Sequence, residues 1–334
     1  MLQGWKATVL MLASMLFAST VQADTSSPPA VDDATFKTRP EVVEVIDEQE
    51  FPDTVRQLPM LMKKIQVERA AADNPYVLLP HRPNYVMPFT YQTRPNDREV
   101  KRLLDRAGND EARLQEEGFD HVEAVFQLSI KYLLAEGLLG KFSTIEVGYT
   151  NRSFWQAYNS DISKPFRETN HEPELMFSWQ LQDQWLEHVG VSFNHQSNGQ
   201  TSSLSRSWNR IIFEGAKLSG KNIWFGRAWW RWPEGKEGDP FDPSDNDNPD
   251  IDDYLGHGEL HYLRVMDEHS FTVMMRNNLQ RKENRGAVEI SYSFPLTPRI
   301  KGFVQYFNGY GESLIDYNVY QERIGFGIKL SDWL

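Results

Sequence analysis

The segment Val288-Glu289-Ile290-Ser291-Tyr292-Ser293-Phe294 alternates apolar and polar side chains without a break. Successive side chains of a β-strand point to opposite faces of the sheet, so this segment predicts a strand with one apolar and one polar face. The segment Ile324–Leu330 repeats the pattern, with glycine and lysine at the alternate positions. Each run is close to the length of about 9–11 residues that a tilted strand needs to cross a bilayer.

The same alternation recurs along most of the chain and predicts twelve strands. They lie near residues 82–93, 121–134, 142–151, 171–181, 187–197, 206–216, 221–231, 257–266, 269–277, 285–294, 297–307 and 320–332. Links after even-numbered strands are short, such as Lys217–Gly220, whereas 94–120, 152–170 and 232–256 are long. Single-chain outer-membrane barrels have an even number of strands, short periplasmic turns and long extracellular loops. We therefore expect an all-β fold, a 12-stranded antiparallel transmembrane β-barrel of the bacterial outer membrane with short periplasmic turns and long extracellular loops.

The composition agrees with this expectation and disfavours one class of binding partner. The formal net charge of −12 disfavours nucleic acid as a partner. The chain contains no cysteine, so no disulfide can stabilise the fold. The sequence is hydrophilic on average, but a membrane barrel remains so because its strands alternate. Five tryptophans are candidates for the aromatic girdles at the membrane surfaces: Trp179, Trp185, Trp224, Trp229 and Trp230.

The first residues predict export. Residues 1–23 combine Lys6, an apolar run over Ala7–Ala18 and a small residue at position 23, as a cleaved signal peptide does. Residues 24–80 form an acidic, proline-containing lead-in, with a short helix expected over 58–71. The remaining residues, 81–334, form the predicted barrel domain.

A histidine and a serine two residues apart form the most informative motif. His195 and Ser197 fall on one face of their predicted strand, and Asn209 lies on the next strand. A serine nucleophile, a histidine base and an asparagine that orients the imidazole would form a hydrolase triad. His195 and Ser197 share their face with the apolar Val191 and Phe193, so in a barrel the triad faces lipid. Such a placement suits an enzyme whose substrate is the membrane, and an acyl ester of a phospholipid lies at that depth.

The oxyanion of such a reaction needs electrophilic partners. The backbone N–H of Gly199, two residues after the serine, is a candidate donor. A calcium ion is a second candidate, since Ser205 and the loop Asp245–Asp250 offer oxygen ligands at the same end. The acidic loop lacks the pattern of an EF-hand, and such runs are more often plain solvated loops.

Several segments together resemble a known family. His195–Gly199 and Ser205–Arg210, with Pro165–Asn170, Asn248–Ile251 and Gly309–Asn318, closely resemble the bacterial outer-membrane phospholipase A family, and the similarity runs from about residue 73 to the C-terminus. The resemblance implies a calcium-dependent phospholipase A1/A2 that hydrolyses phospholipids and lysophospholipids. It also implies activation by formation of a homodimer.

The resemblance also implies roles for residues of this chain. Ser197 is the expected nucleophile, His195 the base, Asn209 the orienting residue and Gly199 the oxyanion donor. Calcium would bind the carbonyl of Gln200, the hydroxyl of Ser205 and the carbonyl of Ser163 from the partner subunit, and Asp250 matches a further calcium site. Some members carry Asp where this chain has Ser202, which leaves that further site open.

Two other functions remain possible from the residues alone. A non-catalytic outer-membrane barrel, a porin or an adhesin, would carry His195 and Ser197 by chance, although twelve strands enclose only a narrow lumen. A secreted soluble lipase would use the same alternation with its apolar face inward. The sequence gives no acyl-chain or headgroup preference, no dimer affinity or trigger, and no role for residues 24–72.

Overall fold

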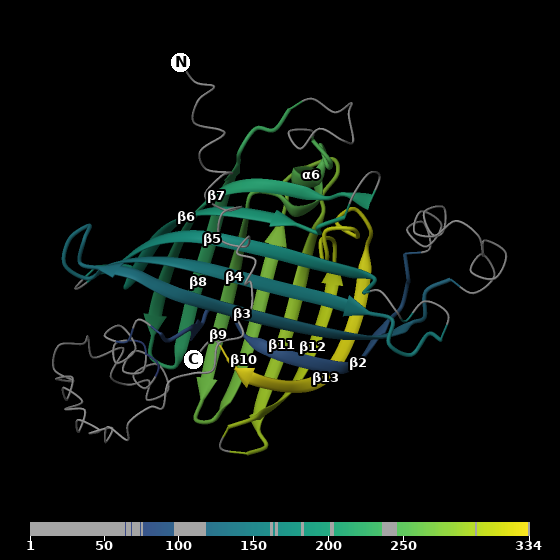
Figure 1. Cartoon of the computed structure of the whole chain (residues 1–334), viewed down its shortest axis with the longest axis horizontal. Helices are drawn as coiled ribbons and strands as arrows, with labels where there is room; N and C mark the ends of the chain where they lie inside the picture. Colours follow the sequence, from purple (N-terminus) through teal and green to yellow (C-terminus); the bar gives the residue numbers. More distant parts are fainter. Residues whose placement is uncertain are drawn as a thin grey trace, which may run out of the picture. The chain divides into compact units, whose positions relative to one another are not determined.

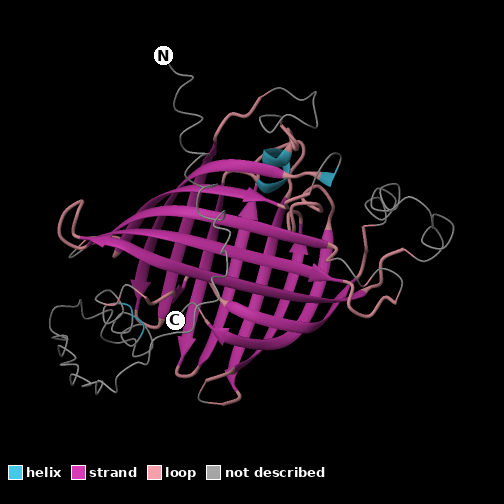
Figure 2. Cartoon of the chain, in the orientation of Figure 1, coloured by secondary structure: helices cyan, strands magenta, loops and turns pink. Residues whose placement is uncertain are grey.

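The computed structural model describes residues 64, 68, 74, 76–96, 118–160, 163, 166–181, 184–200, 204–235, 246–297 and 299–332. Their strands are β1 (Leu79–Pro80), β2 (Asn84–Gln92), β3 (Val122–Glu136), β4 (Ser143–Trp155), β5 (Glu168–Gln180), β6 (His188–Ser197), β7 (Ser207–Ser219), β8 (Asn222–Arg231), β9 (Gly258–Met266), β10 (His269–Asn277), β11 (Gly286–Pro295), β12 (Lys301–Gly309) and β13 (Gln321–Ser331). The short helix α6 (Ile251–Leu255) precedes β9. Strands make up most of the regular structure in Figure 2.

The barrel closes because its first and last long strands pair. β2 and β13 run antiparallel, with Phe89 opposite Phe326 and Tyr91 opposite Ile324. Every other long strand pairs with its neighbours in sequence, so β2 to β13 form one closed sheet (Figure 1). Closure pairs the backbone groups that a membrane interior could not hydrate. The predicted 12-stranded antiparallel barrel is confirmed.

The predicted strands match the observed ones to within a few residues. β10 covers 269–277 as expected, whereas β12 begins at Lys301 rather than at 297. The difference arises because a tight turn occupies the start of the predicted strand, where the N–H of Ile300 donates to Oγ1 of Thr297 at 3.0 Å. A turn hydrogen bond of this kind uses a donor that the ladder would otherwise need.

One short strand was not predicted. β1 pairs with β3 through Leu79 and Pro80, further along the same edge of β3 that β2 occupies. Pro83, which cannot donate to a ladder, lies between β1 and β2. The sheet therefore begins two residues before the expected boundary between residues 80 and 81.

The predicted signal peptide, residues 1–23, lies outside the described residues, as do most of the lead-in and most of the expected helix over 58–71. The signal peptide, the lead-in and the helix stay predictions. No helix in the described part of the chain is long and apolar enough to cross a membrane.

The apolar face of the sheet is outside and the polar face is inside. On β11, Ile290 is 37% exposed and Tyr292 is 38% exposed, whereas Ser291 and Ser293 are buried. Phe326 on β13 is likewise exposed. A soluble barrel would bury these apolar side chains, so this arrangement fits a barrel whose outer surface meets lipid.

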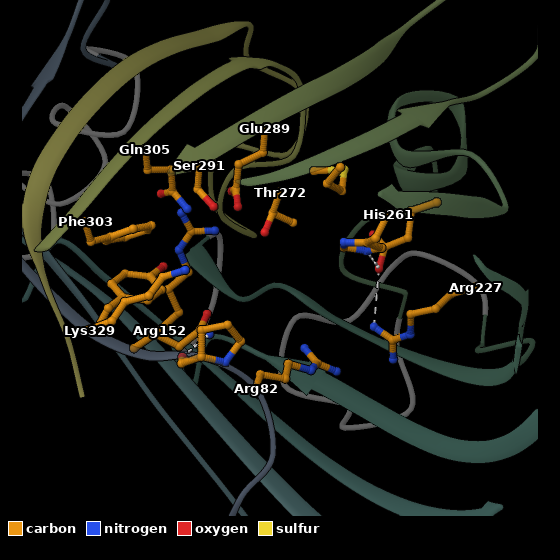
Figure 3. Close-up of a pocket in the computed structure, with 15 residues that line it drawn as sticks. Arg82, Arg152, Arg227, His261, Thr272, Glu289, Ser291, Phe303, Gln305 and Lys329 are labelled. Atoms are coloured by element: carbon orange, nitrogen blue, oxygen red, sulfur yellow. Dashed lines mark hydrogen bonds and ion pairs between the residues drawn. The ribbon is translucent and has the colours of Figure 1, made fainter. Parts of the chain in front are cut away.

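Ion pairs fill the interior. Arg82 binds Glu172 at 2.6 Å and Glu174 at 2.7 Å, and Arg227 and Arg210 extend the network to the same two carboxylates. Beside it lies a cavity of about 120 Å³, and Figure 3 shows side chains from several strands pointing into it. Buried charges are tolerated where they are paired in this way.

A second network lies at the end of the barrel that carries the long loops. Arg167 contacts Glu123 at 2.9 Å and Asp316 at 2.7 Å, and Arg323 contacts Glu123 at 2.7 Å and Glu312 at 2.8 Å. All five side chains are at most 2% exposed. The network ties the loop after β12 to β3 and to the start of β5.

Candidate active site

The register of β6 and β7 brings two of the predicted catalytic residues together. His195 is directly opposite Asn209, and Oδ1 of Asn209 lies 2.8 Å from Nδ1 of His195. An amide oxygen only accepts hydrogen bonds, so this contact places the imidazole proton on Nδ1. The other ring nitrogen, Nε2, is then left with a lone pair that can accept a proton.

Ser197 lies on the same strand and face as His195. Both side chains are half-buried, and Phe193 on the same face of β6 is 51% exposed. Phe213, on the same face of β7 as Asn209, is 56% exposed. Inward-facing residues of these strands, such as Arg210, are buried. The candidate triad therefore lies on the outer, apolar surface of the barrel.

Glu234 holds the other side of the Asn209 amide, a contact that sequence reasoning missed. Nδ2 of Asn209 donates to Oε1 of Glu234 at 3.0 Å, and a guanidinium N–H of Arg231 donates to Oε2 at 3.1 Å. Burial raises the pKa of Glu234 above its usual value, and the contact with Arg231 opposes that rise. No motif signals this contact, because Glu234 follows β8 and lies 25 residues after Asn209.

The backbone at Gly199 is held in a conformation that favours glycine. Its φ is +62°, in the left-handed region, and the residue is exposed. The buried side chain of Asn198 fixes the loop on both sides, because Nδ2 donates to the carbonyl of Leu204 at 2.9 Å and Oδ1 accepts the N–H of Arg206 at 3.0 Å. Asn198 is a second positioning residue that sequence reasoning missed.

His171 lies beside this loop, on β5. It is directly opposite Ser197, and a Cβ atom at Gly199 would lie 3.6 Å from its ring. The hydroxyl of Tyr149 is 2.6 Å from Nδ1 of His171. The imidazole of His171 thus forms one wall of the space around Ser197 and Gly199.

The predicted calcium ligands come from several loops at this same end. The hydroxyl of Ser205 donates to Oδ2 of Asp247 at 2.7 Å, so a carboxylate adjoins that candidate ligand. The N–H of Gln200 donates to Oδ1 of Asn198 at 3.3 Å. The carbonyl of Ser163 accepts the indole N–H of Trp155 at 2.7 Å. The hydroxyl of Ser205 and the carboxylate of Asp247 are oxygen donors of the kind that calcium prefers.

Asp250 is placed differently from the other candidate ligands. It precedes α6, and its Oδ1 accepts a hydrogen bond from the hydroxyl of Tyr317. Asp247, not Asp250, contacts Ser205. Ser202 lies outside the described residues. No cluster of three or more His, Cys, Asp or Glu side chains suited to a metal occurs in the described part of the chain.

An apolar cluster supports the loops behind the site. Trp208 of β7 packs against Trp229 of β8 with their rings 6.2 Å apart. Ile251 of α6 and Tyr317 join the cluster, and Figure 1 shows α6 at the end of the barrel near β7. The expectation that Trp229 belongs to a girdle is wrong, because the side chain is 5% exposed and its indole donates to the carbonyl of Gly256. Trp224 and Trp230 are exposed.

Comparisons with known proteins agree with this architecture. A family model described as phospholipase A1 matches residues 61–330. A phospholipase A1 of Klebsiella pneumoniae is 34% identical over 264 residues, covering 78% of this chain and 84% of the relative. The structure of outer membrane phospholipase A from Escherichia coli matches with 32% identity and a TM-score of 0.67, over 78% of this chain and 95% of that one. The Salmonella typhi outer membrane phospholipase, a dimer with bound calcium, matches with the same identity and TM-score, over 78% of this chain and 94% of that one.

Proposed function

The chain belongs to the phospholipase A1 family, and we propose that Ser197, His195 and Asn209 form its lipid-facing catalytic triad. The protein is an outer-membrane β-barrel phospholipase. The observation that carries the triad is the contact of 2.8 Å between His195 and Asn209 on the outer face of the barrel. We further propose that the site cleaves either acyl ester of a phospholipid and also acts on lysophospholipids.

The reaction follows the logic of serine hydrolases. Nε2 of His195 removes the proton from Ser197 as the serine oxygen attacks the ester carbonyl carbon. The tetrahedral intermediate expels the glycerol oxygen, which takes that proton from His195. Water then attacks the acyl carbon of the acyl-serine while His195 takes its proton, and the fatty acid leaves as His195 returns that proton to the oxygen of Ser197. Asn209 holds the ring so that Nε2 faces the serine throughout.

The N–H of Gly199 is the proposed donor to the oxyanion. Calcium, when bound, would supply positive charge to polarise the carbonyl group of the ester. Ser205 and the carbonyl of Gln200 would hold it, together with the carbonyl of Ser163 of the partner subunit. The carboxylate of Asp247 beside Ser205 supports this placement. We propose Asp250 as a ligand of a further calcium site.

Dimerisation would make the activity conditional. A triad that faces lipid at the outer leaflet would otherwise digest its own membrane continuously. A site completed by a second copy would be active only where two barrels meet. Activity in micelles should therefore rise with the dimer fraction, and full activity of a purified monomer would contradict this part of the proposal.

A porin is the main alternative, and the interior disfavours it. The Arg82 network fills the interior with paired charges, and the Arg167 network adds paired charges at the long-loop end. The test compares fatty-acid release from a defined phospholipid in mixed micelles by the wild type and by Ser197→Ala. Ser192→Ala, which changes a buried serine on the inward face of β6, is the matched control. Loss of release in Ser197→Ala alone supports the proposal, and equal release by all three proteins would refute it.

A further inference from the structure

We infer that Glu234 is a positioning residue that fixes the orientation of the Asn209 amide. The inference rests on the proposed triad and goes one residue beyond it. Among the contacts of the described residues, Asn209 is the only link between His195 and Glu234. Its Oδ1 faces His195 at 2.8 Å, and its Nδ2 faces Glu234 at 3.0 Å.

The need for such a residue follows from the chemistry of an amide. An aspartate presents an acceptor to the imidazole whichever way it rotates, but an asparagine presents either an acceptor or a donor. Only the acceptor can hold the proton of His195 on Nδ1 and stabilise the imidazolium that forms during the reaction. A carboxylate on the far side accepts from Nδ2 and would repel Oδ1, so it selects the productive orientation.

Glu234 is itself held in place. Arg231 donates to its Oε2 at 3.1 Å and also donates to Oδ1 of Asn246 at 2.7 Å, so the carboxylate is anchored on the side away from Asn209. Among the described residues, the charged groups that act on Glu234 are Arg231 and Asp247. Burial of the carboxylate keeps water from competing for Nδ2 of Asn209.

The test is a double-mutant cycle on the intact protein in calcium-containing mixed micelles. Glu234→Ala is expected to lower kcat at least tenfold with little change in KM, because the amide can then turn its donor toward His195. In the Asn209→Ala background the same change should have no further effect, since Glu234 acts through Asn209. In Glu234→Gln, Arg231 would take the single remaining oxygen and leave an NH2 group facing Asn209, so this variant should lose rate as Glu234→Ala does.

The pH profile gives a second readout. The acid limb of kcat/KM reports the pKa of the free catalytic base. Loss of the acceptor on Nδ1 changes the surroundings of the proposed base, so the acid limb of Glu234→Ala should differ from that of the wild type. Glu283→Gln, on an exposed loop at the same end, is the matched control and should leave both rate and profile unchanged.

Two outcomes would overturn the inference: wild-type kcat in Glu234→Ala, or an equal loss of rate from Glu234→Ala in the wild-type and Asn209→Ala backgrounds. Ser197→Ala is assayed in parallel. If Ser197→Ala remains active, the proposed triad fails. If Ser197→Ala and Asn209→Ala lose activity while Glu234→Ala does not, only the role of Glu234 fails.

Discussion

His195 and Asn209 lie directly opposite each other on β6 and β7, with Nδ1 of the imidazole 2.8 Å from Oδ1 of the amide. The pairing of two strands therefore places the amide of Asn209 beside the imidazole of the proposed base. A slip of one residue in this register would turn Asn209 toward the lumen. The geometry of the proposed His195–Asn209 pair is thus a direct consequence of the sheet.

Asn209→Ala should lower kcat by about a hundredfold, because a ring that is no longer oriented rarely presents Nε2 to the serine. His195→Ala should abolish turnover, because the base itself is lost. Asn308→Ala, which removes an amide elsewhere at the long-loop end, should leave the rate unchanged. Fatty-acid release in micelles measures all three, and equal activity of Asn209→Ala and the wild type would contradict the assigned role.

Gly199→Ala should keep the fold but lose activity. The positive φ makes alanine cost about 1–2 kcal/mol, and displacement of one oxyanion donor typically costs a hundred- to a thousandfold in rate. Gly220→Ala is the matched control, since Gly220 has a φ of +57° at the short-turn end and an added Cβ would meet no atom within 4 Å. We expect both variants to lose similar stability, but only Gly199→Ala to lose activity. Equal activities would exclude Gly199 from the reaction.

Calcium should be required, and Ser205→Ala should raise the calcium concentration needed for half-maximal activity. The substitution removes one proposed ligand while leaving Asp247 in place. Ser219→Ala, at the opposite end of β7, serves as the control. A titration of activity against free calcium gives the answer. Full activity in excess chelator would remove calcium from the mechanism and leave the serine chemistry intact.

Arg167→Met should destabilise the barrel by about 3–5 kcal/mol, because Glu123 and Asp316 would remain buried without this partner. Lys221→Met breaks an exposed pair with Asp267 and should change stability by about 0–1 kcal/mol. Unfolding by urea in micelles measures both. A negligible effect of Arg167→Met would show that the network is not structural.

The pKa of Glu234 predicts a pH dependence of stability. Burial raises it above the usual value of 4.5, so the folded protein retains this proton at a pH where the unfolded chain has lost it. The resulting stabilisation is full below that usual value and is lost as pH rises through the folded pKa. The free energy of unfolding of Glu234→Gln relative to the wild type should therefore increase with pH over this range. A constant or falling difference would contradict the raised pKa.

Most of the barrel could be predicted because each strand carries a period of two in its own sequence. The outward orientation of the His195 and Ser197 side chains could be predicted because they fall on the same face of the strand as Phe193. The exposure of Phe193 confirms this orientation. The contacts of Glu234 could not be predicted, since they join a loop to a distant strand through three-dimensional packing. Trp229 shows the same limit: its residue type suggests a girdle, but α6 covers it.

The most direct test of the central claim is to identify the residue that reacts as a nucleophile. The wild type would be treated in calcium-containing micelles with a fluorophosphonate that carries a long alkyl chain, and the adduct located by peptide mass spectrometry. The account predicts a single adduct on Ser197, absent from Ser197→Ala and much slower to form in His195→Ala. An adduct on another residue, with phospholipid hydrolysis preserved in Ser197→Ala, would contradict it.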